Sequence, residues 1–267
     1  MSPPGLDADE IDAYREQGVV VPRWRLPPDR LAGLRAALDQ VIADNPGVRP
    51  EQLISAHIAR GSAEHVKGSD EFLRFACDPE IVRLVTPLIG PDVILWGCQV
   101  FCKPAGDGRE VPWHQDGQYW PIRPLATCTL WLALDDSRVD NGCLRVIPGS
   151  HAGQRIGEHV FEDRKDMIVR RSLAKEEFEE GAAVDVELEP GQMVMFDVYT
   201  VHGATHNRGA VPRAGYALRF MPSTSHFDHD GAERRDEPGY AHNTRPLFLA
   251  RGRDVSGLND FERGHPG

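Results

Sequence analysis

The chain has 267 residues, 40% of them hydrophobic, and a formal net charge of −11 at pH 7. This length suits one large domain or two small ones, and all-β folds of this size are commonly single domains. The negative charge argues against nucleic acid or an anionic membrane as a partner, and its ordinary meaning is solubility.

The first third of the chain shows helical spacing of apolar residues, with stop signals between the segments. An acidic start and Gly18 bound a first short helix, and a valine-rich strand follows that glycine. Proline and aspartate open the later helices, and Asn-Pro-Gly and Gly-Pro end two of them. Helices are therefore expected at residues 7–17, 27–42, 69–77 and 78–88, with a short strand at 18–22.

From residue 93 the pattern changes to short segments of strand character, separated by turn residues. Residues 151–180 are charged and poorly patterned, and we interpret them as an insertion with some helix between 173 and 179. The tail from residue 223 contains the polar pair His226 and His229 and has no evident core role. Strands are expected at 93–101, around His114, and at 126–134, 144–148, 183–188, 193–196 and 214–222.

Helices followed by short strands predict a mainly β fold with flanking helices. The core would be a β-sandwich or jelly-roll, with the helices packed on one sheet. We expect a single domain over residues 1–267. Its helical part covers about 1–92, its β core about 93–222 and its C-terminal tail 223–267.

A metal site is indicated by His114 and Asp116, which are two residues apart in a segment of strand character. Residues i and i+2 of a strand point to the same face, so an imidazole and a carboxylate project side by side. Two histidines and one carboxylate on one face of an octahedron leave open positions, as in non-heme Fe(II) oxygenases. The best second histidine is His202, near a strand end. His206 competes with it, although a polar loop position is its simpler interpretation.

Further motifs accompany this pattern in a fixed order. They are His114-Gln115-Asp116, Trp131, residues 140–144, 147–151 and 202–213, and the opening stretch 14–20. The ordered combination resembles the phytanoyl-CoA dioxygenase (PhyH) family of Fe(II)- and 2-oxoglutarate-dependent oxygenases, over roughly residues 8–225. The resemblance implies a double-stranded β-helix core of the jelly-roll or cupin type. It also implies Fe(II) as the metal, with 2-oxoglutarate and O2 as co-substrates.

In that family an arginine eleven residues past the distal histidine binds the far carboxylate of 2-oxoglutarate, and here this position is Arg213. A guanidinium suits a carboxylate because it donates two parallel hydrogen bonds. Arg208 and Arg219 are rivals. Arg219 lies six residues further along the same strand, about 20 Å away at the usual rise. We therefore favour Arg213, whose simpler interpretation is a salt bridge at the rim.

The resemblance also places Trp131 and Gln99 beside the co-substrate. Thr129 shares the strand face of Trp131 and is expected to donate a hydrogen bond to the near carboxylate. Members of the family often carry a serine two residues after the distal histidine, where this chain has Ala204. That departure puts one hydrogen bond to 2-oxoglutarate in question, and not the site.

The implied reaction is hydroxylation of an unactivated C–H bond of a small-molecule metabolite, with natural-product scaffolds as one substrate class. It is coupled to decarboxylation of 2-oxoglutarate to succinate and CO2. Asp116 favours hydroxylation, because related halogenases have glycine or alanine there. Gln118, Tyr119 and Trp120 follow the metal motif and are candidates to border the substrate, whereas His151 is interpreted as structural.

Other functions stay open on the sequence alone. The same iron site could catalyse desaturation, epimerisation or cyclisation. A non-catalytic jelly-roll that binds a metal or ligand is a second class, and a Zn(II) hydrolase is a third.

The five cysteines form no C-x-x-C pair and lie mostly among apolar residues, as buried free thiols do. They favour a reducing cytoplasm. The N-terminus lacks the basic and apolar regions of a signal peptide, and no apolar run approaches the roughly 20 residues of a membrane span. The expected partner is a small-molecule substrate, with no nucleic acid and no membrane, and both a monomer and a homodimer remain open.

Overall fold

The structure is a computed structural model that describes residues 5–60, 65–231 and 241–265. Side-chain caps begin three of the four α-helices in the described ranges, where the sequence predicted them. Asp7 and Glu10 form a capping box at the first helix, and Ser69 and Asp78 cap the third and fourth. The first helix ends at Gly18, whose φ of 72° favours glycine. The helices are α1 Ala8–Gln17, α2 Pro28–Asp44, α3 Asp70–Ala76 and α4 Pro79–Ile89.

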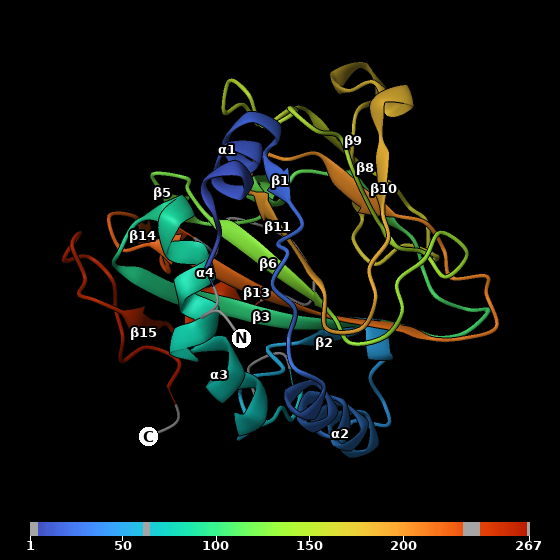
Figure 1. Ribbon diagram of the computed structural model, residues 1–267, viewed down its shortest axis with the longest axis horizontal. Coiled ribbons are helices and arrows are strands. Elements are labelled where there is room, and N and C mark those ends of the chain that lie inside the picture. Colours follow the sequence, from blue (N-terminus) through green and yellow to red (C-terminus); the bar gives the residue numbers. More distant parts are fainter. Residues whose placement is uncertain (1–4, 61–64, 232–240, 266–267) are drawn as a thin grey trace.

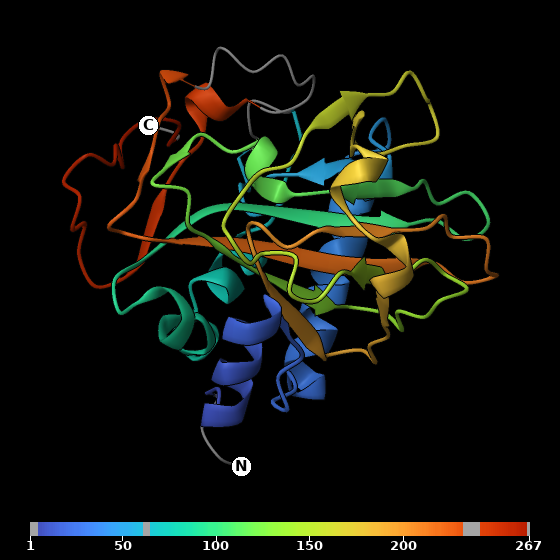
Figure 2. The same ribbon diagram turned by 90° about the horizontal axis from the view of Figure 1, so that it is seen from above.

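One antiparallel sheet of seven strands has the order β1-β11-β6-β13-β3-β15, with β2 also paired to β3. The long strands β13 and β3 lie side by side across its middle, as Figure 2 shows. The strands are β1 Val19–Val20, β2 Leu53–Ile54, β3 Val93–Lys103, β6 Cys128–Ala133, β11 Met193–Asp197, β13 Arg213–Pro222 and β15 Phe248–Arg251.

A second antiparallel sheet has the order β10-β7-β12-β4. Its strands are β4 Val111–His114, β7 Leu144–Val146, β10 Val184–Val186 and β12 His202–Ala204. Trp131 and Ala217 of the large sheet share an apolar cluster with Val146 and Val186 of the second sheet. Two sheets that pack through their inner faces form the predicted jelly-roll core, so the expected fold class is confirmed.

The helices cover the outer face of the large sheet (Figure 1). Leu38 of α2, Phe72 of α3 and Leu84 of α4 belong to the same buried cluster as Leu130 of β6. The next residue of β6, Trp131, belongs instead to the cluster between the sheets. This alternation follows from the period of two in a strand. It leaves the inner face of the large sheet available for a site.

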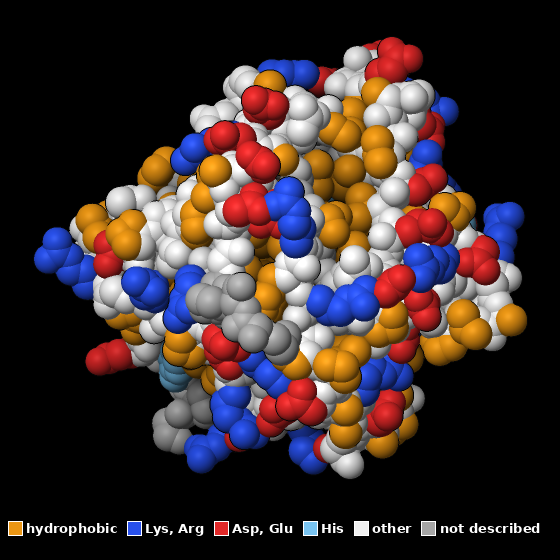
Figure 3. All heavy atoms as spheres, viewed as in Figure 1, with side chains coloured by type: hydrophobic (Ala, Val, Ile, Leu, Met, Phe, Trp, Pro, Cys, Tyr) orange, Lys and Arg blue, Asp and Glu red, His pale blue; other side chains and the backbone are white. Residues whose placement is uncertain are grey.

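None of the helices in the described ranges combines the length and apolar character that a bilayer-spanning segment needs. On the face shown in Figure 3, acidic and basic side chains are intermingled and do not gather by sign. All five cysteines are free thiols, and four of them are buried.

The helix expected within residues 173–179 is limited to the 3-10 turn Lys175–Glu177, none of whose residues is buried. Without an apolar face to pack on the core, a longer helix gains too little to form. The insertion instead forms a two-stranded hairpin of β8 His159–Phe161 and β9 Arg171–Leu173.

The C-terminal tail contributes more to the core than the sequence indicated. Strand β15 extends the large sheet by pairing with β3. Strand β14, His226–Phe227, pairs with β5, Ile122–Arg123. His229 is buried, and its Nε2 lies 2.8 Å from the Arg245 carbonyl oxygen. The polar histidines of the tail are therefore part of the packed structure.

Candidate active site

The histidines and the aspartate of the predicted metal site meet at the edge of the second sheet. His114 ends β4, His202 begins β12, and the two residues are partners in the strand register. Asp116 follows β4 in a 3-10 turn. Its Oδ1 lies 3.6 Å from His114 Nε2 and 4.0 Å from His202 Nε2. Three ligand atoms that face one point in this way suit a 2-His-1-carboxylate centre.

Backbone carbonyl groups hold both imidazole rings in the orientation that a metal needs. His114 Nδ1 lies 2.8 Å from the Pro112 carbonyl oxygen, and His202 Nδ1 lies 2.9 Å from that of Thr200. A proton on each Nδ1 leaves the Nε2 lone pairs on the side of Asp116. Burial and the neighbouring His114 lower the pKa of His202 to about 4. Its ring is therefore neutral at physiological pH and ready to bind a metal.

Asp116 is buried and nevertheless ionised. Burial acts to raise its pKa, but the hydrogen bond with His114 and the charges around His202 and Arg219 outweigh that effect and lower the pKa. Thr129 Oγ1 lies 3.4 Å from the second carboxylate oxygen, Oδ2. The carboxylate thus has one oxygen turned to the histidines and the other beside a hydroxyl.

A cavity lies beside these three residues, between the two sheets. Its empty space, which includes the open mouth, is about 780 Å³. The charged and metal-binding side chains in its wall are His114, Asp116, His202, Arg213 and Arg219. Of the other residues that the sequence singled out, Tyr119, Trp120, Thr129 and Trp131 also line it.

Arg213 is a buried cation in this cavity, with its guanidinium carbon 5.2 Å from the centre of the Trp131 ring. Its side chain is 2% exposed, and its Nε has no hydrogen-bond partner in the described part of the chain. Burial lowers the pKa of Arg213 to about 10, so the group stays charged at neutral pH. Gly215 makes room for this arrangement, because a Cβ there would lie 1.8 Å from the Trp131 ring.

Two predicted contacts do not reach the cavity. Gln99 is outside its wall and lies against Arg219, with Gln99 Oε1 3.4 Å from both terminal nitrogens of the guanidinium. Gln118 is also outside the wall, because the 3-10 turn Asp116–Gln118 rotates successive side chains about the turn. Among the rival arginines, Arg208 is exposed, whereas Arg219 lines the cavity with Arg213.

The wall includes residues that the sequence did not single out, among them Phe101 of β3 and Val169 of the insertion. On the sequence alone, Arg213 is favoured over Arg219, because the two residues are about 20 Å apart along the strand. Positions 213, 217 and 219 nevertheless have the same parity on β13, so their side chains share a face. That parity was the available signal. No local pattern points to Val169, because tertiary folding alone brings the insertion to the site.

His151 and Ala204 lie near the motifs, and neither offers a group that would bind the metal. His151 Nε2 lies 3.0 Å from the Arg15 carbonyl oxygen, and its ring lies so close to Gly18 that a Cβ there would be 2.5 Å away. Ala204 lines the cavity with a methyl group where a serine would offer a hydroxyl.

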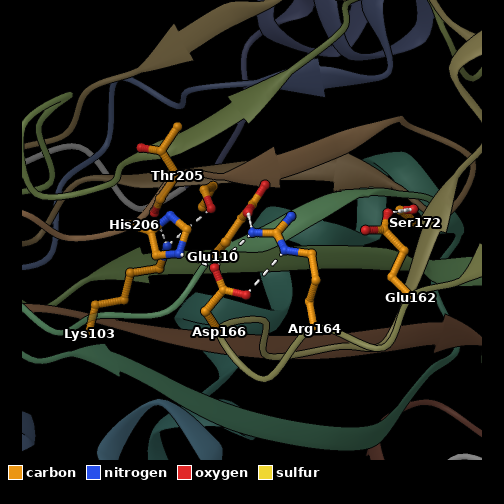
Figure 4. A network of polar contacts seen from close by, with 9 residues as sticks. Lys103, Glu110, Glu162, Arg164, Asp166, Ser172, Thr205 and His206 are labelled. Atoms are coloured by element: carbon orange, nitrogen blue, oxygen red, sulfur yellow. Dashed lines mark hydrogen bonds and ion pairs between the residues drawn. The ribbon is translucent and has the colours of Figure 1, made fainter.

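A second group of metal-ligand types, Glu110, Asp166 and His206, is a salt-bridge network. Figure 4 shows the Arg164 guanidinium beside both carboxylates, with Nη2 2.7 Å from Glu110 and 2.8 Å from Asp166. His206 Nε2 lies 3.1 Å from Asp166. The arginine already satisfies the carboxylates that a cation would need. His206 therefore belongs to this network.

The model of the phytanoyl-CoA dioxygenase (PhyH) family matches residues 14–215. The chain belongs to this family. Human peroxisomal phytanoyl-CoA dioxygenase is 26% identical over 271 residues, which cover 94% of this chain and 77% of the human protein. The ectoine dioxygenase of Sphingopyxis alaskensis is 25% identical, over 97% of this chain and 87% of its own. The apo structure of ThoJ, a non-heme monooxygenase, is similar in fold with a TM-score of 0.72, at 22% identity, covering 94% of this chain and 86% of that one.

Fe(II) and 2-oxoglutarate are the metal and co-substrate of this family, and the residues of this chain fit both. Two imidazoles and one carboxylate converge on one point. Backbone carbonyl groups hold the Nδ1 atoms of both rings, and the Thr129 hydroxyl lies beside the second carboxylate oxygen. The buried Arg213 lies in the same cavity and lacks a partner for its Nε among the described residues. A dicarboxylate would satisfy it.

Proposed function

We propose that the protein is an Fe(II)- and 2-oxoglutarate-dependent hydroxylase of a small-molecule metabolite. The observation that carries the proposal is one cavity that contains both the His114, Asp116 and His202 cluster and the buried Arg213. A binding module would need the metal ligands or the arginine, but an oxygenase of this family needs both. Asp116 supports hydroxylation, since it supplies the third ligand.

The reaction consumes one 2-oxoglutarate and one O2 for each C–H bond hydroxylated. When bound, Fe(II) activates O2, one oxygen atom of which enters the substrate hydroxyl while the other enters succinate as 2-oxoglutarate loses CO2. His114, Asp116 and His202 would hold the metal. The buried, apolar surroundings of these ligands keep bulk water away from the reacting atoms.

The chain's other residues orient the co-substrate and the substrate. Arg213 binds the far carboxylate of 2-oxoglutarate by paired hydrogen bonds, and the Trp131 ring packs against its guanidinium. The Thr129 hydroxyl lies beside Asp116, and it would donate a hydrogen bond to the near carboxylate of 2-oxoglutarate. Tyr119 and Trp120 border the substrate. The whole chain acts as one domain in the cytoplasm, a location that its free, mostly buried cysteines support.

The first experiment measures 2-oxoglutarate binding. Anaerobic protein is titrated with Fe(II) and 2-oxoglutarate, and the visible charge-transfer band of the keto-acid chelate is followed. The wild type is expected to develop the band, and His202→Ala to lose it. Arg213→Leu is expected to raise the Kd for 2-oxoglutarate roughly 10–100-fold, because it removes a charge-assisted pair of hydrogen bonds. Arg208→Leu makes the same change at an exposed arginine and is the matched control.

Oxygen is then admitted and succinate is quantified, with and without a metabolite pool. Succinate that rises with the pool and disappears in His202→Ala and Arg213→Leu is the expected result. A wild type that shows neither the band nor succinate would overturn the oxygenase proposal and favour a non-catalytic binding protein.

A further inference from the structure

Arg219 is a buried cation whose role the metal and 2-oxoglutarate sites do not explain. It is 8% exposed, and its Nε has no hydrogen-bond partner among the described residues. Its terminal nitrogens share one neutral acceptor, Gln99 Oε1, and both distances are 3.4 Å, which is long for such a bond. A guanidinium is costly to bury without an anion within hydrogen-bonding distance, so the arrangement indicates a missing partner.

The position of Arg219 distinguishes it from Arg213. Arg219 is the register partner of Thr129, the residue beside Asp116, whereas Arg213 pairs with Lys103 at the far end of β13. The two guanidinium groups therefore enter the cavity from positions six residues apart on one strand face.

Aromatic rings surround the Arg219 guanidinium. Its central carbon lies 5.4 Å from the Trp120 ring centre and 5.9 Å from those of Trp96 and Phe101. Trp120 and Phe101 line the cavity as well. A planar cation between rings is held in a defined direction, and beyond the long contacts to Gln99 it has further N–H groups to offer an acceptor. The surroundings are those of a preformed anion site with apolar walls.

The charges of the cavity point the same way. Histidines bind a metal as neutral ligands, so the charges in its wall are two guanidinium groups and the Asp116 carboxylate, which leaves one net positive charge. Fe(II) and the 2-oxoglutarate dianion cancel one another, so the loaded cavity keeps that charge. A substrate with one negative charge would neutralise it in a region of low dielectric, where such pairing is strong.

We propose that Arg219 binds the carboxylate of the substrate, so that the natural substrate is an organic acid with an apolar body. This inference rests on the proposed function, since it concerns the substrate of that site. The carboxylate accepts hydrogen bonds from the Arg219 guanidinium, and the apolar body lies along Trp120 and Phe101 toward the metal. Arg219 is thereby a specificity-determining residue, separate from the Arg213 site for 2-oxoglutarate.

The test compares organic acids with their uncharged analogues. Octanoate and phenylacetate, and the primary amide of each, are titrated by calorimetry into metal-free protein and into anaerobic protein loaded with Fe(II) and 2-oxoglutarate. The variants are Arg219→Leu, Arg219→Lys and the control Arg251→Leu, at an exposed arginine of β15. The Kd for 2-oxoglutarate is measured for each by the charge-transfer band.

We expect the wild type and Arg251→Leu to bind at least one acid about tenfold more tightly than its amide. Arg219→Leu abolishes this preference and leaves the Kd for 2-oxoglutarate unchanged, and Arg219→Lys retains part of the preference because it keeps the charge. If Arg219→Leu does not fold, the test is the comparison of the wild type with Arg219→Lys, which should show a reduced preference for the acid over its amide.

Three results would overturn the inference. One is a wild type that binds no acid more tightly than its amide. Another is an Arg219→Leu variant that keeps the acid preference. A tenfold weaker 2-oxoglutarate affinity in Arg219→Leu would also overturn the inference, because it would assign the arginine to the co-substrate. A wild type that shows no charge-transfer band but still prefers acids to amides would count against the oxygenase proposal and not against this inference. The two can be told apart because the acid preference is also measured on metal-free protein.

Discussion

Gly215→Ala tests the packing beneath the proposed 2-oxoglutarate site. A Cβ at this position would lie 1.8 Å from Trp131 Cζ2 and 2.2 Å from Cε2. Carbon atoms in contact are normally about 3.5–4.0 Å apart, so the ring would have to move by roughly 1.7 Å or more. The ring has little room to do so, because Trp131 is 4% exposed and packs between the two sheets.

We expect Gly215→Ala to lower the free energy of unfolding by about 1–3 kcal/mol, the usual cost of overpacking a core. In a chain of this size each kcal/mol corresponds to a fall in Tm of roughly 2–4 °C. Because Trp131 also lies against Arg213, the kcat/KM for 2-oxoglutarate should fall on the order of 10–100-fold. Urea unfolding and succinate formation measure the two effects.

Two further variants separate this clash from a general effect of alanine. Gly33→Ala places a Cβ in open space on α2, where it should stabilise the protein by about 0.5–1 kcal/mol. Trp131→Leu combined with Gly215→Ala removes the ring, so the double variant should be more stable than the sum of the single changes predicts. Wild-type unfolding and wild-type 2-oxoglutarate kinetics in Gly215→Ala would refute the packing of Trp131 on Gly215.

Asp116→Asn replaces the anionic metal ligand by a neutral amide, so we expect Fe(II) to be lost on dialysis; full iron retention, measured by a colorimetric iron assay, would remove Asp116 from the ligand set. Burial lowers the pKa of His57 to about 3, and neither ring nitrogen has a hydrogen-bond partner among the described residues. In the unfolded chain His57 is protonated as the pH falls below about 6.5, whereas in the folded chain it stays neutral until about pH 3. The stability of the folded protein therefore falls as the pH drops below about 6.5. His57→Phe should avoid about 2 kcal/mol of this loss at pH 5. Urea unfolding of the wild type and the variant at pH 7.5 and 5 measures the loss, and equal losses in the two proteins would contradict the prediction. Ser69→Ala removes the side-chain cap of α3 and should cost about 1 kcal/mol by the same method, with no change in 2-oxoglutarate affinity.

Local patterns were sufficient for the helices and for most strands. Capping residues such as Asp7, Ser69 and Asp78 act on backbone groups within one turn, so their effect can be read from neighbouring positions. The spacing of His114 and Asp116 is local in the same sense. The helix expected near residue 175 is only one 3-10 turn long. A longer helix needs an apolar face and a surface to pack on, and none of the Lys175–Glu177 residues is buried.

The partnership between His114 and His202 depends on the register of two strands that lie far apart in the chain. Sequence motifs can nominate these residues, but only the paired strands bring their Nε2 atoms to one carboxylate oxygen. The same holds for the tail, because β15 exists only where the edge of β3 offers hydrogen-bonding groups to pair with.

Arg219 shows most clearly why distance along a chain does not settle the composition of a site. The rise of a strand measures the separation of α-carbons, about 20 Å over six residues. Long side chains on one face still reach a common cavity when a second sheet closes over them, as Arg213 and Arg219 do. The identity of each residue and its strand face were local properties of the sequence. Which residues share the cavity, and with what net charge, was determined by how the two sheets pack.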